Sequence, residues 1–373
     1  MITWLLACAG PPTYHADIAP LIDASCLPCH AKDGASGLPL DDADAVRASL
    51  PAMLAAMQSG RMPAGNLDRS GACGSFTGPG PVDDLAIEML EDWSDEGSPQ
   101  GQIEDSEPTR TAIHFAPDEA FALGPFRDVG DHRCVLIDAD ADASFLRALR
   151  VTGEPANAIH HAMLFTLPSA SDVAQARALD AQDAAEGWTC GATPNVPGAT
   201  LAAVWTPGDP IVAFPAGTGV PLPGGPMVVQ LHLGTDEASA LVELEHAATV
   251  EHELAFYPIA ATHLALPPGE DDVTWTETVP LATPDLQVFG VMPHLHARGR
   301  SLSLRTDDTC LVDAPRWDYR WQELASYTAP VTLRSATPLT LSCAFSTLDA
   351  TAPTVWGEGA DDEMCMVFLL AAR

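Results

Sequence analysis

The chain has 373 residues, of which 51 are acidic and 17 are basic, so its formal net charge at pH 7 is -34. A surface this acidic repels phosphate backbones and anionic lipid headgroups, which argues against nucleic acid as a partner. Hydrophobic residues make up 47% of the chain, as in folded globular proteins, and the length suits two or three domains.

Residues 1–13 predict a signal or lipoprotein-like segment. The apolar run at the start ends at Cys8, and Leu5-Leu6-Ala7-Cys8 fits a bacterial lipoprotein cleavage site, which makes Cys8 a candidate for lipidation. The chain has nine cysteines, which would suggest metal binding or catalysis in a reducing cytosol and disulfides in an oxidising compartment. The CxxCH sequence at 26–30 favours the second. We therefore expect a periplasmic or extracellular protein, membrane-anchored if Cys8 carries a lipid.

Residues 14–98 predict a small all-α domain, because helical patterning covers 18–31, 43–59 and 82–93. The first of these stretches contains Cys26-Leu27-Pro28-Cys29-His30. In a CxxCH motif the two thiols form thioethers to a porphyrin, and the histidine takes one axial position on the iron. We predict that Cys26, Cys29 and His30 hold a covalently bound haem c.

Haem iron in an electron-transfer cytochrome commonly takes a methionine as its second axial ligand. Met62 lies between Pro and Gly residues in a loop, which suits it to present a thioether, whereas Met53 and Met57 share a helix face and are expected to pack in the core. The stretch 14–65 resembles bacterial class I-like cytochrome c domains, with Tyr-x-x-Asp-Ile-x-Pro before CxxCH and Met-Pro after it.

Residues 99–112 are polar and acidic and predict a linker. Beyond the linker, short apolar or alternating runs punctuated by Pro, Gly, Asp and Thr indicate an antiparallel sandwich or jelly roll, with one helix near 171–186. The runs cover 134–137, 162–167, 227–233, 242–245, 286–292, 302–304, 339–345 and 364–370. We predict two β-sandwiches, at 113–252 and 253–373.

Paired histidines mark candidate metal ligands in both sandwiches. His294 and His296 alternate along a strand and therefore leave the same face. His160 and His161 are adjacent and can share a metal only at a strand end or bulge, where His232 could add a third imidazole. Imidazole suits copper, zinc, iron or nickel, and a thioether ligand favours Cu(I). The isolated histidines are interpreted as structural: His15, His114, His132, His246, His252 and His263.

Four motifs occur in a characteristic order: Asn157-Ala158-Ile159-His160-His161-Ala162-Met163-Leu164-Phe165, Gln230-Leu231-His232-Leu233-Gly234, His294-Leu295-His296 and Asp362-Glu363-Met364-Cys365. Together they resemble the copper type II, ascorbate-dependent monooxygenases over roughly 130–370. The resemblance implies two jelly-roll sandwiches, each with one copper ion. It assigns His160, His161 and His232 to an electron-storing copper, and His294, His296 and Met364 to the copper that activates O2.

The same resemblance implies two disulfides, Cys134–Cys190 and Cys343–Cys365, each expected to stabilise its sandwich by about 2–4 kcal/mol. The sequence does not decide whether Cys73 and Cys310 are free or paired with each other.

The expected activity is the hydroxylation of a C–H bond with O2, and the fused cytochrome suggests that electrons arrive through the haem. An ascorbate-like reductant or a redox protein would reduce it. Peptide-amidating relatives hold a carboxylate with an Arg where this chain has Met292, and carry Asn and Tyr where it has Met366 and Phe368. A small apolar or aromatic substrate is therefore expected.

Two other interpretations remain open. One is a periplasmic copper-binding or electron-transfer protein without monooxygenase activity, and the other is a structural β-sandwich lipoprotein with incidental histidines. Zinc hydrolysis is disfavoured, because zinc rarely takes a methionine ligand and no carboxylate accompanies the His294/His296 pair in metallohydrolase spacing.

Overall fold

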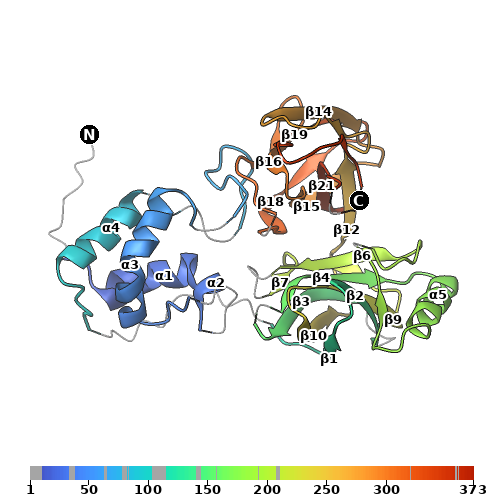
Figure 1. Cartoon of the computed structure of the whole chain (residues 1–373), viewed down its shortest axis with the longest axis horizontal. Helices are drawn as coiled ribbons and strands as arrows, with labels where there is room; N and C mark the ends of the chain where they lie inside the picture. Colours follow the sequence, from blue (N-terminus) through green and yellow to red (C-terminus); the bar gives the residue numbers. More distant parts are fainter. Residues whose placement is uncertain are drawn as a thin grey trace. The chain divides into compact units, whose positions relative to one another are not determined.

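The computed structural model describes residues 11–32, 38–62, 65–77, 82, 84–102, 115–139, 144–156, 158–191, 193–206, 211–319, 321–357, 359 and 361–373. The chain forms two compact units, one from Met1–Ala64 with Pro79–Ala112, and one from Gly65–Gly78 with Ile113–Arg373. The first is helical and the second is β-rich (Figure 1). Cys8, His114 and Asn157 lie outside the described residues.

The helical unit confirms the three predicted helical stretches. Its elements are η1 (Tyr14–Ile18), α1 (Ala19–Ser25), α2 (Leu27–His30), α3 (Ala43–Gln58) and α4 (Asp84–Asp95). The Asp42 carboxylate caps α3 by accepting the backbone N–H groups of Asp44 and Ala45. Ile18, Val46 and Trp93 lie at the centre of a small apolar core. The helical part is therefore small, and most of the chain is β-sheet.

The start of the predicted linker is attached to the helical unit. The Tyr14 backbone N–H donates to the Pro99 carbonyl at 2.9 Å, and the Trp93 indole N–H donates to the same oxygen at 2.9 Å. Residues 103–114 lie outside the described part of the chain. Among the described residues, none of the helices combines the length and the apolar character that crossing a membrane requires.

The amino-terminal part of the β-rich unit consists of two packed sheets. The six-stranded sheet has the order β1-β10-β3-β8-β11, with β7 also paired to β3, and the five-stranded sheet has the order β5-β2-β9-β4-β6. Alternate residues of β2, β4 and β9, such as Val135, Leu164 and Val229, fill the core between them. The bounds are β1 (Glu119–Arg127), β2 (His132–Asp138), β3 (Phe145–Glu154), β4 (Ile159–Thr166), α5 (Ala170–Asp180), β5 (Trp188–Thr189), β6 (Thr200–Trp205), β7 (Val212–Ala213), β8 (Thr218–Pro221), β9 (Pro226–Leu233), β10 (Glu237–Ala247) and β11 (His252–Glu253).

The carboxyl-terminal part repeats the two-layer arrangement with two four-stranded sheets, β12-β21-β15-β18 and β14-β19-β16-β17, and a short β13-β20 pair. Leu302, Leu341 and Leu369 belong to the core between the layers. The bounds are β12 (Ala255–Ala260), β13 (Ala265–Leu266), β14 (Val273–Pro280), β15 (Leu286–His294), β16 (Gly299–Arg305), β17 (Cys310–Ala314), β18 (Ala325–Leu333), β19 (Pro338–Phe345), β20 (Thr354–Val355) and β21 (Met366–Ala372).

A segment that precedes α4 in sequence packs on this second sandwich. We call residues 65–77 the strap. Its Phe76 ring stacks on Tyr327 with centroids 4.9 Å apart, and Cys73 forms a disulfide with Cys310 of β17. The sequence boundaries place these residues inside the 14–98 domain, whereas the structure groups them with the β-rich unit.

Candidate metal centres

Three histidines line up across adjacent strands of the five-stranded sheet. His132 at the start of β2 is the cross-strand partner of His232 on β9, and His232 is in turn the partner of His161 on β4. The residues next to these histidines in sequence, such as Leu231 on β9 and Ala162 on β4, point into the sandwich core. Because side chains alternate between the faces of a strand, the three imidazoles share the outer face of the sheet.

His160 joins this cluster because β4 is irregular at that position. The pairing of β4 with β9 shifts between Ile159 and His161, so one extra residue is accommodated in β4. Nδ1 of His160 lies 3.4 Å from Nδ1 of His161, and its ring centroid lies 4.8 Å from that of His232. This is the bulge that two adjacent histidines need in order to approach one metal ion.

His132 also lies in this cluster, although the sequence predicts a structural histidine there. Its ring stacks on His232 with centroids 4.2 Å apart. Among the described residues, one ring nitrogen each of His132, His161 and His232 lie within 4.8 Å of one another. The signal was present in the sequence, since His132 and Cys134 occupy the same face of an alternating strand.

The electrostatics of this cluster favour neutral imidazoles. Burial lowers the pKa of His161 well below its usual value and lowers the pKa of His232 to about 4, and the neighbouring histidines push both further in the same direction. Burial also lowers the pKa of His160. Nδ1 of His232 is buried without a hydrogen-bond partner. A neutral imidazole is the form that binds metal, so the cluster fits a copper ion.

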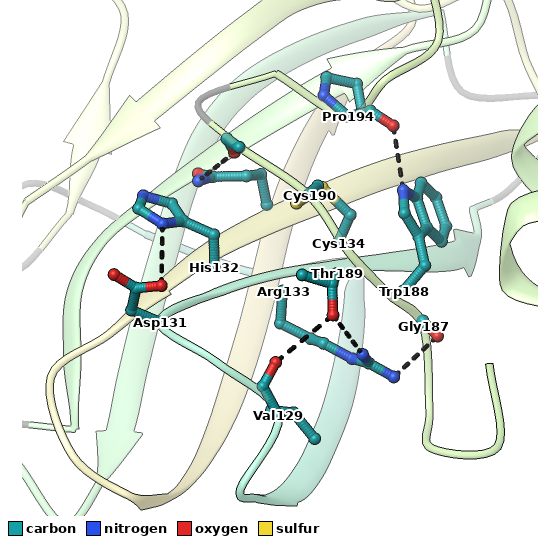
Figure 2. The surroundings of a disulfide bond; sticks show 12 residues. Val129, Asp131, His132, Arg133, Cys134, Gly187, Trp188, Thr189, Cys190 and Pro194 are labelled. Carbon is teal, nitrogen blue, oxygen red and sulfur yellow. Dashed lines mark hydrogen bonds and ion pairs between the residues drawn. A yellow bond between two sulfur atoms is a disulfide. The ribbon is translucent and has the colours of Figure 1, made fainter. Parts of the chain in front are cut away.

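A disulfide and a buried arginine hold the strand that carries His132 (Figure 2). Cys134 is bonded to Cys190, and Arg133 on the opposite face is almost fully buried. The Arg133 guanidinium donates to the carbonyls of Glu186, Ala185 and Gly187 and to the Asp183 carboxylate. This network fixes the 183–190 loop against β2, so the start of β2 has a defined position.

The second candidate centre lies at the end of β15. That strand ends at His294, and His296 follows it, so the two rings approach through the strand end rather than through regular alternation. Their centroids are 5.2 Å apart and their planes are nearly perpendicular. His294 Nδ1–H donates to Gln322 Oε1 at 2.6 Å, and His296 Nδ1–H donates to the Asp362 carbonyl at 3.1 Å.

Both hydrogen bonds select a tautomer. Each acceptor is an oxygen, so Nδ1 carries the proton and Nε2 keeps its lone pair, which is the arrangement found for histidines that bind metals. Burial lowers the pKa of His294 to about 4, with a further contribution from His296, so this ring is neutral at physiological pH. The residues at this site therefore also fit a copper ion.

Glu363 ties the His294/His296 pair to Met364. Its carboxylate accepts the backbone N–H groups of His296, Arg298 and Met364, and its side chain is fully buried. Met364 is itself 8% exposed and stands just before β21, next to Cys365, which is bonded to Cys343. Neither Glu363 nor Gln322 was singled out from the sequence as a supporting residue.

Apolar side chains adjoin His294 on the same face of its sheet, of which Met292 and Met366 are buried and Phe368 is half-buried. In the β15–β21 ladder His294 is the partner of Met366, and Met292 is the partner of Phe368. Their neighbours Val367 and Leu369 point to the opposite face, into the core of the sandwich. The three residues that replace the polar groups of the peptide-amidating pattern therefore stand beside the second centre.

The helical unit places the CxxCH motif across the junction of α1 and α2. His30 Nδ1–H donates to the Leu38 carbonyl at 2.8 Å, which fixes the proton on Nδ1. The side chain of Cys29 lies outside the described residues. Met53 and Met57 pack in or against the apolar core, as expected, and Met62 follows α3 with a half-buried side chain.

Residues 258–371 match the family model described as copper type II ascorbate-dependent monooxygenase, C-terminal domain. A human DBH-like monooxygenase protein 2 is 30% identical over 93 residues, which cover 23% of this chain and 18% of that protein. The match thus spans less than a fifth of the curated relative. The infectious bursal disease virus VP2 subviral particle covers 69% of this chain and 73% of its own at 11% identity, but its TM-score of 0.16 carries no argument. The sequence matches support the copper type II monooxygenase family, and with it a copper oxidoreductase.

Proposed function

We propose that this protein is a dicopper monooxygenase that hydroxylates a C–H bond of a small apolar or aromatic substrate. The observation that carries the proposal is the pair of chemically different centres in the β-rich unit. One is built from imidazoles alone, and the other combines two imidazoles of fixed tautomer with a buried methionine next to them in the fold. The family match covers the second centre.

Copper bound at these centres would supply O2 activation and one-electron transfer. The overall reaction balances as R–H + O2 + 2e⁻ + 2H⁺ giving R–OH + H2O. His294, His296 and Met364 would hold the copper of the second centre, with Gln322 and the Asp362 carbonyl fixing the two ring orientations. The thioether of Met364 would favour the reduced ion, which is the form that meets O2.

His160, His161 and His232 would hold the other copper, which stores the second electron. Their neutral, desolvated rings keep the lone pairs available over the physiological pH range. The β4 bulge allows two consecutive residues to serve one ion, and the Cys134–Cys190 loop fixes the neighbouring strand. This part of the site would exchange electrons and does not need to contact substrate.

The substrate class follows from the face beside His294. Met292, Met366 and Phe368 present apolar groups there, and none of them can pair with a carboxylate. An apolar or aromatic substrate would contact the half-buried Phe368, with Met292 and Met366 buried beside it, and bring a C–H bond to the second centre. Hydroxylation of a glycine-extended peptide at a useful rate would contradict this assignment.

The electron supply is proposed to pass through a haem c. Cys26 and Cys29 would bind it covalently, with His30 and Met62 as axial ligands. The His30–Leu38 hydrogen bond supports the assignment, since it fixes the ring tautomer that an iron ligand needs. A reductant or redox protein would reduce the haem. Reduced haem that passes no electron to either copper in anaerobic stopped-flow would contradict this relay.

Three disulfides fit an extracellular or secreted location. We propose a periplasmic or extracellular protein, with a lipid at Cys8 as its anchor to a membrane. Mass spectrometry of the mature protein, before and after mild ester hydrolysis, tests the lipid directly.

The decisive experiment measures copper and haem stoichiometry on protein matured in a bacterial periplasm. Met364→Ala is the test variant, and His263→Ala is the control, because the His263 side chain is 83% exposed and contacts the Glu277 carboxylate rather than another histidine. We expect two coppers per covalent haem, one copper in Met364→Ala and two in the control. Two coppers with no substrate-dependent O2 consumption would instead favour the electron-transfer alternative.

A further inference from the structure

We propose that His132 is a fourth imidazole donor of the first centre, so that oxidised copper there has four nitrogen ligands. The inference rests on the proposed copper at that centre. His132 does not belong to the His160, His161 and His232 set that the sequence motifs predict. The pairing of β2 with β9 and of β9 with β4 brings it next to His232 and His161.

The distances place His132 beside two of the three proposed ligands. One ring nitrogen each of His132, His161 and His232 lie within 4.8 Å of one another, and the His132 centroid lies 6.3 Å from that of His161. His132 and His232 are directly opposite on neighbouring antiparallel strands, where Cβ atoms are about 5 Å apart. Two imidazoles at that separation can reach one ion from adjacent positions.

The stacked arrangement of the two rings requires one adjustment. Their planes are only 15° apart, and two face-to-face rings cannot both direct a lone pair at the same ion. His132 is the ring that can turn, because it is the first residue of β2 and its side chain is 24% exposed. The χ2 torsion of histidine is broad, so rotation of this ring is a small conformational change.

Asp131 selects the nitrogen that would bind. Its carboxylate lies 3.7 Å from Nδ1 of His132 (Figure 2). A turn of the ring that keeps Nδ1 on the side of Asp131 would hold the proton on Nδ1 and leave the lone pair on Nε2, as carboxylates do for many metal-bound histidines. The backbone of His132 is also held, since its carbonyl accepts the N–H of Cys190, the partner of Cys134 in the disulfide.

A fourth imidazole changes what the centre can do. Four nitrogen donors suit the tetragonal geometry of Cu(II), whereas Cu(I) prefers fewer and softer ligands. His132 would therefore stabilise the oxidised ion and fill the coordination position that O2 or substrate would otherwise take. The first centre would be confined to electron transfer.

The test isolates the first centre in the full-length protein by combining His294→Ala with His296→Ala. In that background, His132→Phe keeps a flat ring against His232 but removes both nitrogens, and His132→Gln provides a second variant should the first fold poorly. His263→Phe is the matched control on an exposed histidine. Circular dichroism verifies folding, pulsed EPR counts the imidazoles coupled to Cu(II), and redox titration gives the midpoint potential.

We expect four coupled imidazoles in the background and the control, and three in both His132 variants. Loss of a donor that favours Cu(II) should weaken the binding of Cu(II) at least tenfold relative to the binding of Cu(I). A tenfold change raises the Cu(II)/Cu(I) midpoint potential by about 59 mV. One copper with three imidazoles and the same potential in all forms would overturn the role of His132 while leaving the proposed function standing. Absence of stoichiometric copper from the background protein would overturn both.

Discussion

Asn66 of the strap offers a test of how the second centre is supported. Its side chain is 3% exposed and makes three hydrogen bonds to one loop. Nδ2 donates to the Asp318 carbonyl at 3.2 Å and to the Trp321 carbonyl at 2.7 Å, and Oδ1 accepts the Asp318 N–H at 2.7 Å. The next residue of that loop, Gln322, holds His294. Asn66 is thus a positioning residue for a proposed copper ligand.

The expected cost of Asn66→Ala follows from these contacts. A neutral hydrogen bond contributes a net free energy of about 1 kcal/mol, and a buried group left without a partner costs about 1–3 kcal/mol. Three lost bonds should therefore lower the unfolding free energy of the β-rich unit by about 3 kcal/mol. Loosening of Gln322 should weaken copper binding at the second centre by about tenfold, the lower end of the effect seen for residues that orient metal ligands.

The assay combines urea unfolding with competitive copper titration. Asn66→Asp keeps one acceptor but turns a buried, charged oxygen toward the Asp318 and Trp321 carbonyls, so its stability should be no higher than that of Asn66→Ala. Ser70→Ala is the control, because the exposed Ser70 hydroxyl accepts only an N–H within the strap at 3.2 Å. If Asn66→Ala matched the control in both stability and copper affinity at the second centre, the argument that the strap positions Gln322 would be refuted.

Three further predictions concern other buried or covalent contacts. Glu363→Gln should lower the free energy of unfolding by about 1–3 kcal/mol, because the amide NH2 would face backbone N–H groups that donate to the carboxylate in the wild type. Chemical unfolding measures the change, and unchanged stability would contradict the prediction. Replacing Cys73 and Cys310 by Ser together should cost about 2–5 kcal/mol, and the further loss of stability on adding reductant should be smaller than in wild type, because only Cys134–Cys190 and Cys343–Cys365 remain to be reduced. Arg133 lowers the pKa of Asp183 to about 2 from 3.8. Because the folded pKa lies below the unfolded one, this stabilisation is present above about pH 4 and is lost as the pH falls towards 2. Limited proteolysis of the 183–190 loop across that range should show the loss in wild type, whereas Asp183→Asn should be equally sensitive throughout.

Periodicity was sufficient to predict most regular elements. The runs at 227–233 and 339–345 became β9 and β19 almost unchanged, and the pattern at 43–59 became α3. These predictions succeed because burial of one face imposes a period of two on a strand and 3.6 on a helix, whatever the partner is. The disulfides Cys134–Cys190 and Cys343–Cys365, implied by the family resemblance, are both present in the structure.

The candidate ligands also fall into two groups: those that a local sequence pattern reveals, and those that only the pairing of strands reveals. The sequence motifs named His160, His161 and His294 as candidates because adjacent or alternating histidines are conspicuous along one strand. They could not rank His132, since a single histidine acquires its significance only from the strand that pairs beside it. The ladder β2-β9-β4 brings together residues separated by about a hundred positions, and no local pattern encodes that register.

The sequence by itself determined the alternation of buried and exposed residues, the histidine and methionine motifs, and the acidic surface, because each depends on neighbours along the chain. Tertiary structure alone decided that the strap joins the second sandwich through Cys73–Cys310, that β4 bulges at His160, and that Gln322 and Glu363 support the second centre. Those features depend on strand register and on contacts between distant segments, which are set by the packing of the whole unit rather than by any local sequence pattern.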